Sequence, residues 1–560
     1  MVSNPQASPT HMTGGAAVAQ SLVAHGVDTV FGIPGAHNLA LYDALCDLPS
    51  VRHIVARHEQ GAAFMADGYA RASGKVGICL TTSGPAALNA VTSLGTAYSD
   101  SSPVFCIASQ IPLDAIGLEK GFLHECHDQL GCLRPVTSWC KRAETVKAIP
   151  DLMREAFVRM QSGRPRPTAL EIPCDVLDSS DDVTIPNAGE IIRPKPDAAS
   201  VKRAIDVLRS ARRPVIWAGG GGVSSGADKE LLQLAERLQA PVFTTVLGRG
   251  AIPDDHPLAT GANVLYPPAR DYVAGCDAML AVGTRFTQEE SDNWKLRLPP
   301  SLVHVEIDAN EIDRNYPATV GVVGDARESL QLINDGLIDT DSSSICDDRA
   351  AELATLKKRI IEECRERAPD GVKLVETLRA ALPRETIVVS DLTVAAYWCR
   401  RLLDYYEPRT NVYPWGFCTL GFGVPAAIGA KAARPDRPVV VICGDGGFLF
   451  NAQELAVAVQ FDLPIIVLLF NDGAYGVLRQ QQQVLYGRTN AADLANPDFV
   501  ALAKAFYANA QRVTTIDALG PAISTALKSG RTTVIEAVFD VPWQAMEPSA
   551  DIYAPKGAPS

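Results

Sequence analysis

The chain has 560 residues, too many for a single hydrophobic core, and this length predicts about three domains. Hydrophobic residues make up 47% of the chain, which is enough apolar surface for several cores. The formal net charge of −13 gives no electrostatic attraction to nucleic acid or to an anionic membrane, so neither is expected as a partner.

The first predicted domain covers residues 12–182. A helix is expected over residues 15–25, followed by a strand over 29–32 and a turn over 33–38. Short β-branched apolar runs then alternate with helical periods, which is typical of a parallel α/β domain. Residues 182–196, rich in Pro, Asp and Asn, are predicted to form a linker.

A second domain is predicted over residues 197–338. It begins with a strand over 214–218 that ends in four glycines at 219–222. The polar run at 339–348 is rich in Ser and Asp and is predicted to be a second linker.

The third predicted domain covers residues 371–545, and the chain after Trp543 is expected to be an extended arm. Strands are expected over 386–390, 438–443 and 464–470, and these runs are nearly all apolar, as strands covered on both faces of a sheet require. The predicted fold class is therefore α/β, with three doubly wound parallel-sheet domains.

The strand expected at 438–443 runs directly into Gly444-Asp445-Gly446-Gly447, where backbone N–H groups can approach a phosphate. A helix through residues 452–460 and another strand lead to Asn471-Asp472-Gly473. Asp445 and Asn471 then lie at the carboxyl ends of successive strands, and both carry the oxygen ligands that Mg²⁺ prefers. The alternative is two unrelated turns, since Gly-Asp-Gly is common in loops.

Gly444-Asp445-Gly446 followed by Asn471 resembles the diphosphate-binding motif of thiamine-diphosphate enzymes. The resemblance covers nearly the whole chain, in the order of the acetolactate synthase and benzoylformate decarboxylase superfamily. It implies a pyrimidine-binding, a central and a diphosphate-binding domain, with thiamine diphosphate and Mg²⁺ as cofactors. It further implies that Asp445, Asn471 and the carbonyl of Gly473 hold Mg²⁺, and that Gly444, Gly446 and Gly447 bind the cofactor.

Glu59 opens an amphipathic helix in the stretch from Arg57 to Ala63, and taken alone it is a surface acid near a helix start. The resemblance implies that its carboxylate binds N1′ of the cofactor's aminopyrimidine. That bond favours the imino tautomer, which can remove the thiazolium C2 proton and so produce the ylid. The ylid attacks the substrate, and an enamine intermediate follows. Glu59 is thus the predicted activating acid.

The resemblance also places Pro85 and Asn89 against the pyrimidine ring, although this chain has Ala86 where acetolactate synthases usually have Gly. It makes Leu420 the apolar wedge that bends the cofactor and the carbonyl of Cys418 the acceptor for the 4′-amino group. In relatives the residues matching Glu59 and Asp445 serve one cofactor from different subunits. A homodimer or homotetramer with active sites at the subunit interface is therefore expected.

Three departures argue against ordinary acetolactate synthase activity. Cys174 replaces a family Lys, His124-Glu125 replaces a pocket Phe-Gln pair, and Gln481 falls near a pocket Trp. A carboxylate at Glu125 suits a substrate with a cationic or hydroxylated tail. The alternative is a structural role for Glu125, either as a helix cap or paired with Arg134.

Two further stretches bear on the substrate. The loop that contains Pro34 and the stretch that begins at Tyr475 are similar to those of guanidino-oxo-acid decarboxylases, and both residues are expected to contact the cofactor. Gly35-Ala36-His37 is similar to benzaldehyde lyase, whose matching His relays protons at the substrate oxygen. His37 is therefore a candidate catalytic residue, against the alternative of a structural histidine.

Relatives bind FAD in the central domain, near stretches similar to residues 283–286 and 306–308 of this chain. The glycine run at 219–222 is a weak dinucleotide signal, because such runs are often only turns. FAD therefore stays an alternative and is not part of the main prediction. A flavin-dependent oxidoreductase, similar to pyruvate oxidase, is accordingly the second functional hypothesis, and a scaffold without catalysis is the third.

The thirteen cysteines are irregularly spaced and include no Cys-x-x-Cys pair, which is typical of reduced thiols. The first residues lack the pattern of a signal peptide, and no apolar run is long enough to span a membrane. The sequence thus predicts a cytoplasmic enzyme that decarboxylates a 2-oxo acid, with or without ligation of the product to a second carbonyl compound.

Overall fold

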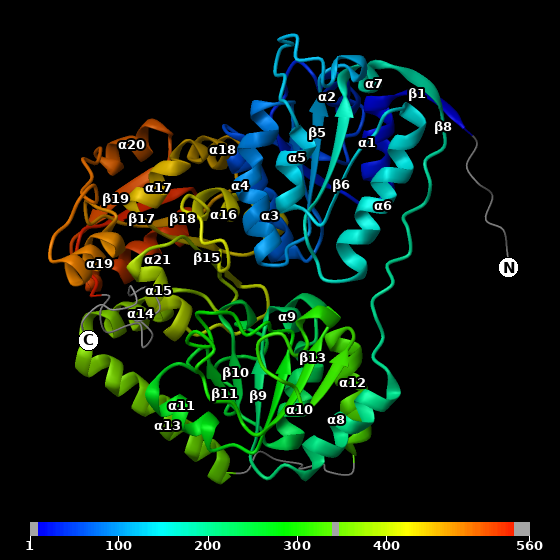
Figure 1. The fold of residues 1–560 in the computed structure, drawn as a ribbon. Coiled ribbons are helices and arrows are strands. Elements are labelled where there is room, and N and C mark those ends of the chain that lie inside the picture. The colour runs from blue at the N-terminus through cyan, green and yellow to red at the C-terminus, as the bar shows by residue number, and fades with distance from the viewer. Residues whose placement is uncertain (1–8, 339–346, 543–560) are drawn as a thin grey trace.

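The computed structural model describes residues 9–338 and 347–542, and Figure 1 shows them in three α/β lobes that meet at the centre of the molecule. Each lobe contains a six-stranded sheet, and all the strand pairs within these three sheets are parallel. The predicted α/β class with three parallel-sheet domains is thereby confirmed. The exact domain boundaries stay predictions.

The N-terminal sheet has the strand order β3-β2-β4-β5-β7-β6. A small antiparallel pair, β1 with β8, joins the two ends of this lobe. The central strands β4 and β5 are buried throughout, which agrees with the mainly apolar residues along them. The strands are β1 (Thr10–Thr13), β2 (Thr29–Gly32), β3 (Arg52–Val55), β4 (Gly77–Thr81), β5 (Val104–Gln110), β6 (Trp139–Arg142), β7 (Thr168–Pro173) and β8 (Ser180–Val183). The helices are α1 (Gly14–Ala24), α2 (Leu39–Cys46), α3 (Glu59–Ser73), α4 (Pro85–Ser99), α5 (Gln129–Leu133), α6 (Ile149–Ser162) and α7 (Cys174–Asp178).

The central sheet has the order β11-β10-β9-β12-β13-β14, in which the strand order reverses beside β9. Its strands are β9 (Pro214–Ala218), β10 (Val242–Thr244), β11 (Ala259–Gly261), β12 (Ala278–Val282), β13 (Ser301–Glu306) and β14 (Val320–Val323). Its helices are α8 (Ala198–Ser210), α9 (Gly220–Ser225), α10 (Asp228–Leu238), α11 (Pro267–Ala274) and α12 (Ala326–Gly336). The long helix α13 (Asp347–Arg367) then leads towards the last lobe.

The C-terminal sheet has the order β16-β15-β17-β18-β20-β19. Its strands are β15 (Ile387–Ser390), β16 (Asn411–Val412), β17 (Val439–Gly444), β18 (Ile466–Phe470), β19 (Asn509–Val513) and β20 (Thr533–Ala537). Its helices are α14 (Pro369–Ala381), α15 (Val394–Leu402), α16 (Gly423–Ala433), α17 (Asp445–Phe450), α18 (Leu455–Gln460), α19 (Gly476–Tyr486), α20 (Phe499–Ala505) and α21 (Leu519–Ser529).

The N- and C-terminal lobes pack through α3 and α16, which Figure 1 shows side by side at their boundary. A Cβ added to Gly68 would overlap the carbonyl oxygen of Ala426, and one added to Gly429 would overlap that of Met65. The two helix backbones therefore approach each other more closely than larger residues permit. This contact joins the two lobes directly.

One helix of the C-terminal lobe was not predicted. The helix expected over residues 452–460 is present, as a 3-10 turn over 452–454 followed by α18, but α17 precedes it from Asp445 onwards, and the helical path is interrupted between them at Asn451. The Asn451 amide donates to the carbonyl of Gly421 and to the side chain of Gln60, so the break serves contacts with two distant segments. The predicted second linker over 339–348 lies outside the described residues up to 346, and its last two residues belong to α13 instead. The predicted arm after Trp543 also lies outside the described residues.

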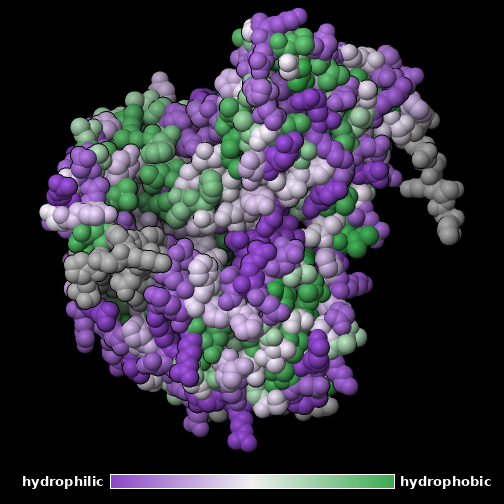
Figure 2. All heavy atoms as spheres, in the orientation of Figure 1, coloured by the Kyte–Doolittle hydropathy of each residue, from purple (hydrophilic) through white to green (hydrophobic). Residues whose placement is uncertain are grey.

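The three lobes share a polar junction. On the face drawn in Figure 2, hydrophilic residues gather where the lobes meet.

Within the described part of the chain, no helix has both the length and the apolar character needed to cross a membrane.

Candidate active site

Asp445 and Asn471 follow neighbouring parallel strands of the C-terminal sheet. The register pairs Gly444, at the end of β17, with Phe470, at the end of β18, so the next residue of each strand emerges at the same edge. Asp445 is only 2% exposed. The structure therefore brings together the two side chains that the sequence analysis placed at successive strand tips.

The oxygens of these two side chains converge on one amide group. Asp445 Oδ2 accepts from the backbone N–H of Ala474 (3.1 Å) and from Nδ2 of Asn496 (2.6 Å). Asn471 Oδ1 accepts from the backbone N–H of Gly473 (3.2 Å) and from the same Asn496 nitrogen (3.0 Å). The donor set of one carboxylate and one amide oxygen suits a hard cation such as Mg²⁺.

A buried carboxylate fixes the orientation of Asn471. Glu536 lies within β20 and is 1% exposed; its Oε1 accepts from Asn471 Nδ2 at 2.8 Å, and its Oε2 accepts from Arg512 Nε at 2.7 Å. Asn471 Oδ1 is thereby turned towards Asp445. The sequence analysis did not single out Glu536, although a charged residue in the middle of an apolar strand was an available signal.

The glycines of this region make room for the neighbouring side chains. A Cβ on Gly446 would lie 2.6 Å from the ring of Tyr475, so this predicted cofactor residue packs directly over the glycine turn. Gly473 has a φ of +65°, and its carbonyl accepts from the backbone N–H of Leu494 at 2.7 Å. A carbonyl oxygen has a second lone pair, so this bond is compatible with the predicted role of Gly473 as a metal ligand.

Asp391 holds the loop that carries Cys418 and Leu420. Its buried carboxylate accepts from the backbone N–H groups of Gly421 and Gly423 at 3.1 and 2.9 Å. Burial raises the pKa of Asp391 to about 6. Cys418 is exposed with a φ of +57°, whereas Leu420 is half-buried. Asp391 was also missed by the sequence analysis, since nothing in its local sequence indicates these partners.

In the N-terminal lobe, Glu59 is the first residue of α3 and contacts the start of α4. Asn89 Nδ2 donates to Glu59 Oε2 at 2.9 Å. Pro85 is the first residue of α4 and lies one turn before Asn89, and both are exposed. The structure thus gathers the three residues predicted to face the aminopyrimidine.

Glu454 of the C-terminal lobe binds the backbone that precedes Glu59. Its side chain is fully buried, and both of its carboxylate oxygens accept from the N–H of Arg57, at 3.2 and 3.1 Å. A Cβ on Gly61 would lie 2.5 Å from Glu454 Oε1. The segment that follows Asp445 in the chain therefore anchors the start of the helix that carries Glu59.

Burial raises the pKa of Glu454 to about 7, above its ordinary value of 4.5, so the folded protein retains a proton there that the unfolded chain releases. This group's contribution to stability consequently falls as the pH rises from about 4.5 to about 7. We expect Glu454→Gln to remove that part of the pH dependence, and Glu454→Ala to destabilise the protein by about 1–3 kcal/mol by leaving the Arg57 N–H without its acceptor. Melting curves of both variants at pH 5 and pH 8 measure this; parallel pH profiles for wild type and Gln would contradict it.

His37 and the His124–Glu125 pair lie in neighbouring loops. His37 Nδ1 is 2.5 Å from the hydroxyl of Ser83, and its ring meets the ring of His124 edge-on at 5.5 Å. Burial, with a smaller effect from His124, lowers the pKa of His37 and favours the neutral imidazole. A Cβ on Gly84 would overlap the carbonyl of His124, so this loop abuts the turn before α4.

Glu125 Oε2 accepts from the backbone N–H groups of Gly121 and Phe122 at 2.6 and 2.9 Å, whereas Oε1 is buried without a hydrogen-bond partner. One oxygen thus stabilises the loop itself, and the second has an unmet capacity to accept. Pro34 is exposed in the loop after β2, where the neighbouring Gly35 N–H donates to Asn38 Oδ1 at 2.7 Å.

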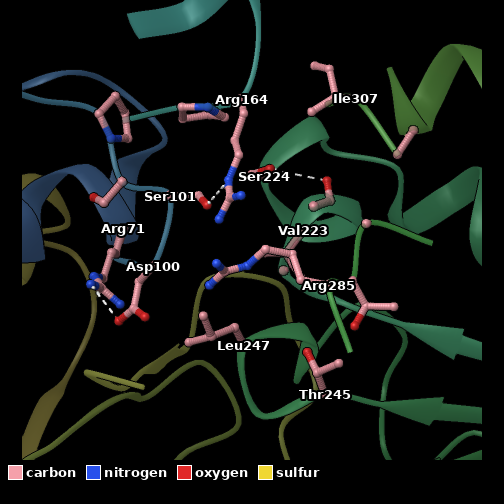
Figure 3. A pocket seen from close by; sticks show the side chains of 18 of the residues that line it. Arg71, Asp100, Ser101, Arg164, Val223, Ser224, Thr245, Leu247, Arg285 and Ile307 are labelled. Carbon is pink, nitrogen blue, oxygen red and sulfur yellow. Dashed lines mark hydrogen bonds and ion pairs between the residues drawn. The ribbon is translucent and has the colours of Figure 1, made fainter. Parts of the chain in front are cut away.

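A separate pocket lies mainly between the N-terminal and central lobes and is closed by residues of the C-terminal lobe, among them Arg409 and Trp415 (Figure 3). Two arginines link its walls: Arg285 donates to the carbonyl of Ser99 at 2.8 Å, and Arg164 donates to Ser101 Oγ and to Glu311, each at 2.8 Å. Burial and the nearby Arg285 lower the pKa of Arg164 to about 10. Several of the residues discussed for FAD line this pocket, namely Gly220, Gly221, Gly283, Thr284, Arg285, Glu306 and Ile307. Such guanidinium groups suit the phosphates of a dinucleotide.

The fold and the strand-tip site define a three-domain α/β protein whose outer lobes carry the predicted functional residues. Comparison with known families adds three matches in the same order. Residues 12–132 match the thiamine pyrophosphate enzyme N-terminal TPP binding domain, residues 201–333 the central domain, and residues 391–537 the C-terminal TPP binding domain.

Whole-chain relatives agree with these matches. A protein of Pseudomonas aeruginosa named probable 2-ketoarginine decarboxylase is 38% identical, over 94% of each chain. A probable acetolactate synthase large subunit of Methanocaldococcus jannaschii is 36% identical, over 94% of this chain and 92% of its own. The acetolactate synthase isozyme 3 large subunit of Escherichia coli is 33% identical over 88% of both. The chain belongs to the thiamine pyrophosphate enzyme family, as its sequence motifs predicted.

Proposed function

We propose that the protein is a thiamine-diphosphate- and Mg²⁺-dependent enzyme that decarboxylates a 2-oxo acid, and that releases the aldehyde or joins it to a second carbonyl compound. The convergence of Asp445 and Asn471 at one edge of the C-terminal sheet is the observation that carries this proposal. When bound, thiamine diphosphate would supply the carbon nucleophile and the electron sink for decarboxylation.

The residues divide the work between the two outer lobes. Asp445, Asn471 and the carbonyl of Gly473 would hold Mg²⁺, with the glycine turn after β17 beside the diphosphate. Glu59 would hold a proton at N1′ of the pyrimidine, with Asn89 fixing its carboxylate. We propose a homodimer or homotetramer in which these lobes of different subunits complete each site.

Near the predicted substrate position, His37 would exchange a proton with the substrate oxygen, because its pKa is lowered towards the neutral form. Glu125 lies in the adjacent loop and would select the far end of the substrate. Assays of CO₂ release from a panel of 2-oxo acids, with thiamine diphosphate and Mg²⁺ present, test the proposal. The panel should include a guanidinium-tailed, a hydroxylated, an aromatic and a small aliphatic acid. Absence of release and of carboligation with every acid would refute it.

For Glu125→Gln we expect kcat/KM to fall for a guanidinium-tailed substrate, with a loss of transition-state binding energy of about 2 kcal/mol. This is the low end of the cost of breaking a buried charge pair, because the Glu125 side chain is half-buried. Pyruvate should be affected little, since it has no cationic tail. The Gln side chain keeps an oxygen for the N–H groups of Gly121 and Phe122. Measuring kcat/KM for both substrates with a melting curve tests this; an equal loss for both, with a lower melting temperature, would assign Glu125 to loop stability alone.

A flavin-dependent oxidation is the second candidate, favoured by the arginine-lined pocket of Figure 3. It requires bound FAD, and the pocket would then receive its phosphates at Arg164 and Arg285. A purified protein with a flavin absorption spectrum and substrate-dependent oxygen uptake would support oxidation. A colourless protein that releases CO₂ without oxygen uptake would support the decarboxylase.

A further inference from the structure

Asn496 lies between the two side chains proposed to hold the metal. Its amide nitrogen is 2.6 Å from Asp445 Oδ2 and 3.0 Å from Asn471 Oδ1. Asn496 lies ahead of α20, in a segment that returns over the strand tips, and no sequence motif pointed to it.

The surrounding hydrogen bonds determine which end of the Asn496 amide faces this position. The Asp445 carboxylate accepts a hydrogen bond from the backbone N–H of Ala474 and, when ionised, can only accept. Asn471 donates its own Nδ2 to Glu536, so its oxygen is the atom turned towards Asn496. Only an N–H₂ group can satisfy both oxygens, which fixes the orientation of the Asn496 side chain.

A cation bound by Asn471 has to contact Oδ1, the single oxygen of that side chain, which Asn496 Nδ2 approaches at 3.0 Å, and Mg²⁺–oxygen bonds are only about 2.0–2.1 Å long. The ion and the Asn496 nitrogen therefore compete for one position. We propose that Asn496 is a displaceable substitute for the cation: it holds the two ligands together in the metal-free protein and withdraws when the ion binds. This inference rests on the proposed metal site.

Two features of the structure favour withdrawal over coordination by Asn496 itself. Its Oδ1 is buried without a hydrogen-bond partner, so no bond at that atom has to break when the side chain leaves. The segment is also attached by its backbone, independently of this side chain. Leu494 N–H donates to Gly473 O at 2.7 Å, and Tyr475 N–H donates to Ala492 O at 2.8 Å. The side chain can therefore rotate while the segment stays in place.

The energetic consequence is a trade between the two states. Removing the Asn496 amide deprives the buried Asp445 carboxylate of its shortest hydrogen bond in the metal-free protein only, because the ion replaces that bond in the loaded protein. The metal-free state alone is destabilised, so Mg²⁺ should bind more tightly. The usual strength of a hydrogen bond to a charged group predicts that the affinity for Mg²⁺ rises about 10-fold.

The test uses the full chain stripped of metal. Mg²⁺ is then titrated into it in the presence of thiamine diphosphate, and calorimetry measures the Mg²⁺ affinity. For Asn496→Ala we expect the metal-free melting temperature to fall and Mg²⁺ to bind about 10-fold more tightly than to wild type. Asn490→Ala is the matched control, an exposed residue of the same segment that should change neither value. If the Ala variant does not fold, Asn496→Ser should show the same two changes.

Weaker Mg²⁺ binding by the Asn496 variants would overturn the proposal and make Asn496 a ligand. Unchanged affinity and unchanged metal-free stability would overturn it as well. A wild-type protein that binds no Mg²⁺ would instead refute the metal site itself, an outcome distinguishable because it appears before any substitution is made.

Discussion

Replacing Glu59 by Gln is expected to lower kcat by about 10²- to 10⁴-fold while the fold and cofactor affinity stay nearly unchanged. Gln has the same shape, and its oxygen can still accept from Asn89 Nδ2, which lies 2.9 Å from Glu59 Oε2. The amide cannot hold a proton at N1′ of the pyrimidine, so the loss should appear in turnover. Glu59 begins α3 and has no role in the helix core, which is why stability should not suffer.

Three measurements on this variant separate chemistry from structure: kcat, thiamine diphosphate affinity by calorimetry, and the melting temperature. Glu144→Gln is a suitable control, because Glu144 is an exposed acid of the same lobe. Near-full activity of the Glu59 variant would show that another group activates the cofactor.

Asp445→Ala should weaken Mg²⁺ and thiamine diphosphate binding together by at least about 100-fold. Loss of a residue that only orients a metal ligand costs about 10- to 100-fold in affinity, and Asp445 supplies the proposed charged ligand itself. The two affinities should fall in parallel, because the ion links the protein to the diphosphate. The substitution also removes the acceptor of Ala474 N–H, so the metal-free protein should melt at a lower temperature.

Calorimetric titration of thiamine diphosphate at fixed Mg²⁺, and of Mg²⁺ at fixed thiamine diphosphate, gives both affinities for the Asp445 variant. Asp493→Ala is the matched control, since Asp493 is an exposed acid whose carboxylate pairs with Arg479 at 3.2 Å. If thiamine diphosphate bound the Asp445 variant as tightly as wild type, the anchor would have to lie elsewhere.

The sequence predicted those parts of the site that depend on local chain order. Strands β2 and β9 begin and end where the apolar runs placed them. The rule that parallel strands end at a common edge was sufficient to bring Asp445 and Asn471 together.

The supporting residues could not be predicted, because their partners are distant in the sequence. Glu454 binds Arg57 in another lobe, Glu536 turns Asn471 from a strand near the end of the chain, and Asn496 reaches both strand tips from a loop. Periodicity reports which face of an element is buried but not which distant backbone group it meets. Helix α17 was not predicted for the same reason, since the break at Asn451 that separates it from α18 serves contacts outside its own segment.

The close approach of α3 and α16 has a consequence for the symmetry of the molecule. The two outer sheets have the same strand order, and each helix joins the second and third strands of its own domain. Gly68 meets Ala426 while Gly429 meets Met65, so the contact is reciprocal, as across the two-fold axis of a homodimer. This reciprocal contact makes Met65 and Ala426 equivalent positions of the two helices. Glu59 and Leu420 are then equivalent too, because Glu59 precedes Met65 by as many positions as Leu420 precedes Ala426. The predicted proton-holding acid and the predicted wedge thus occupy equivalent places in two domains that share one strand order.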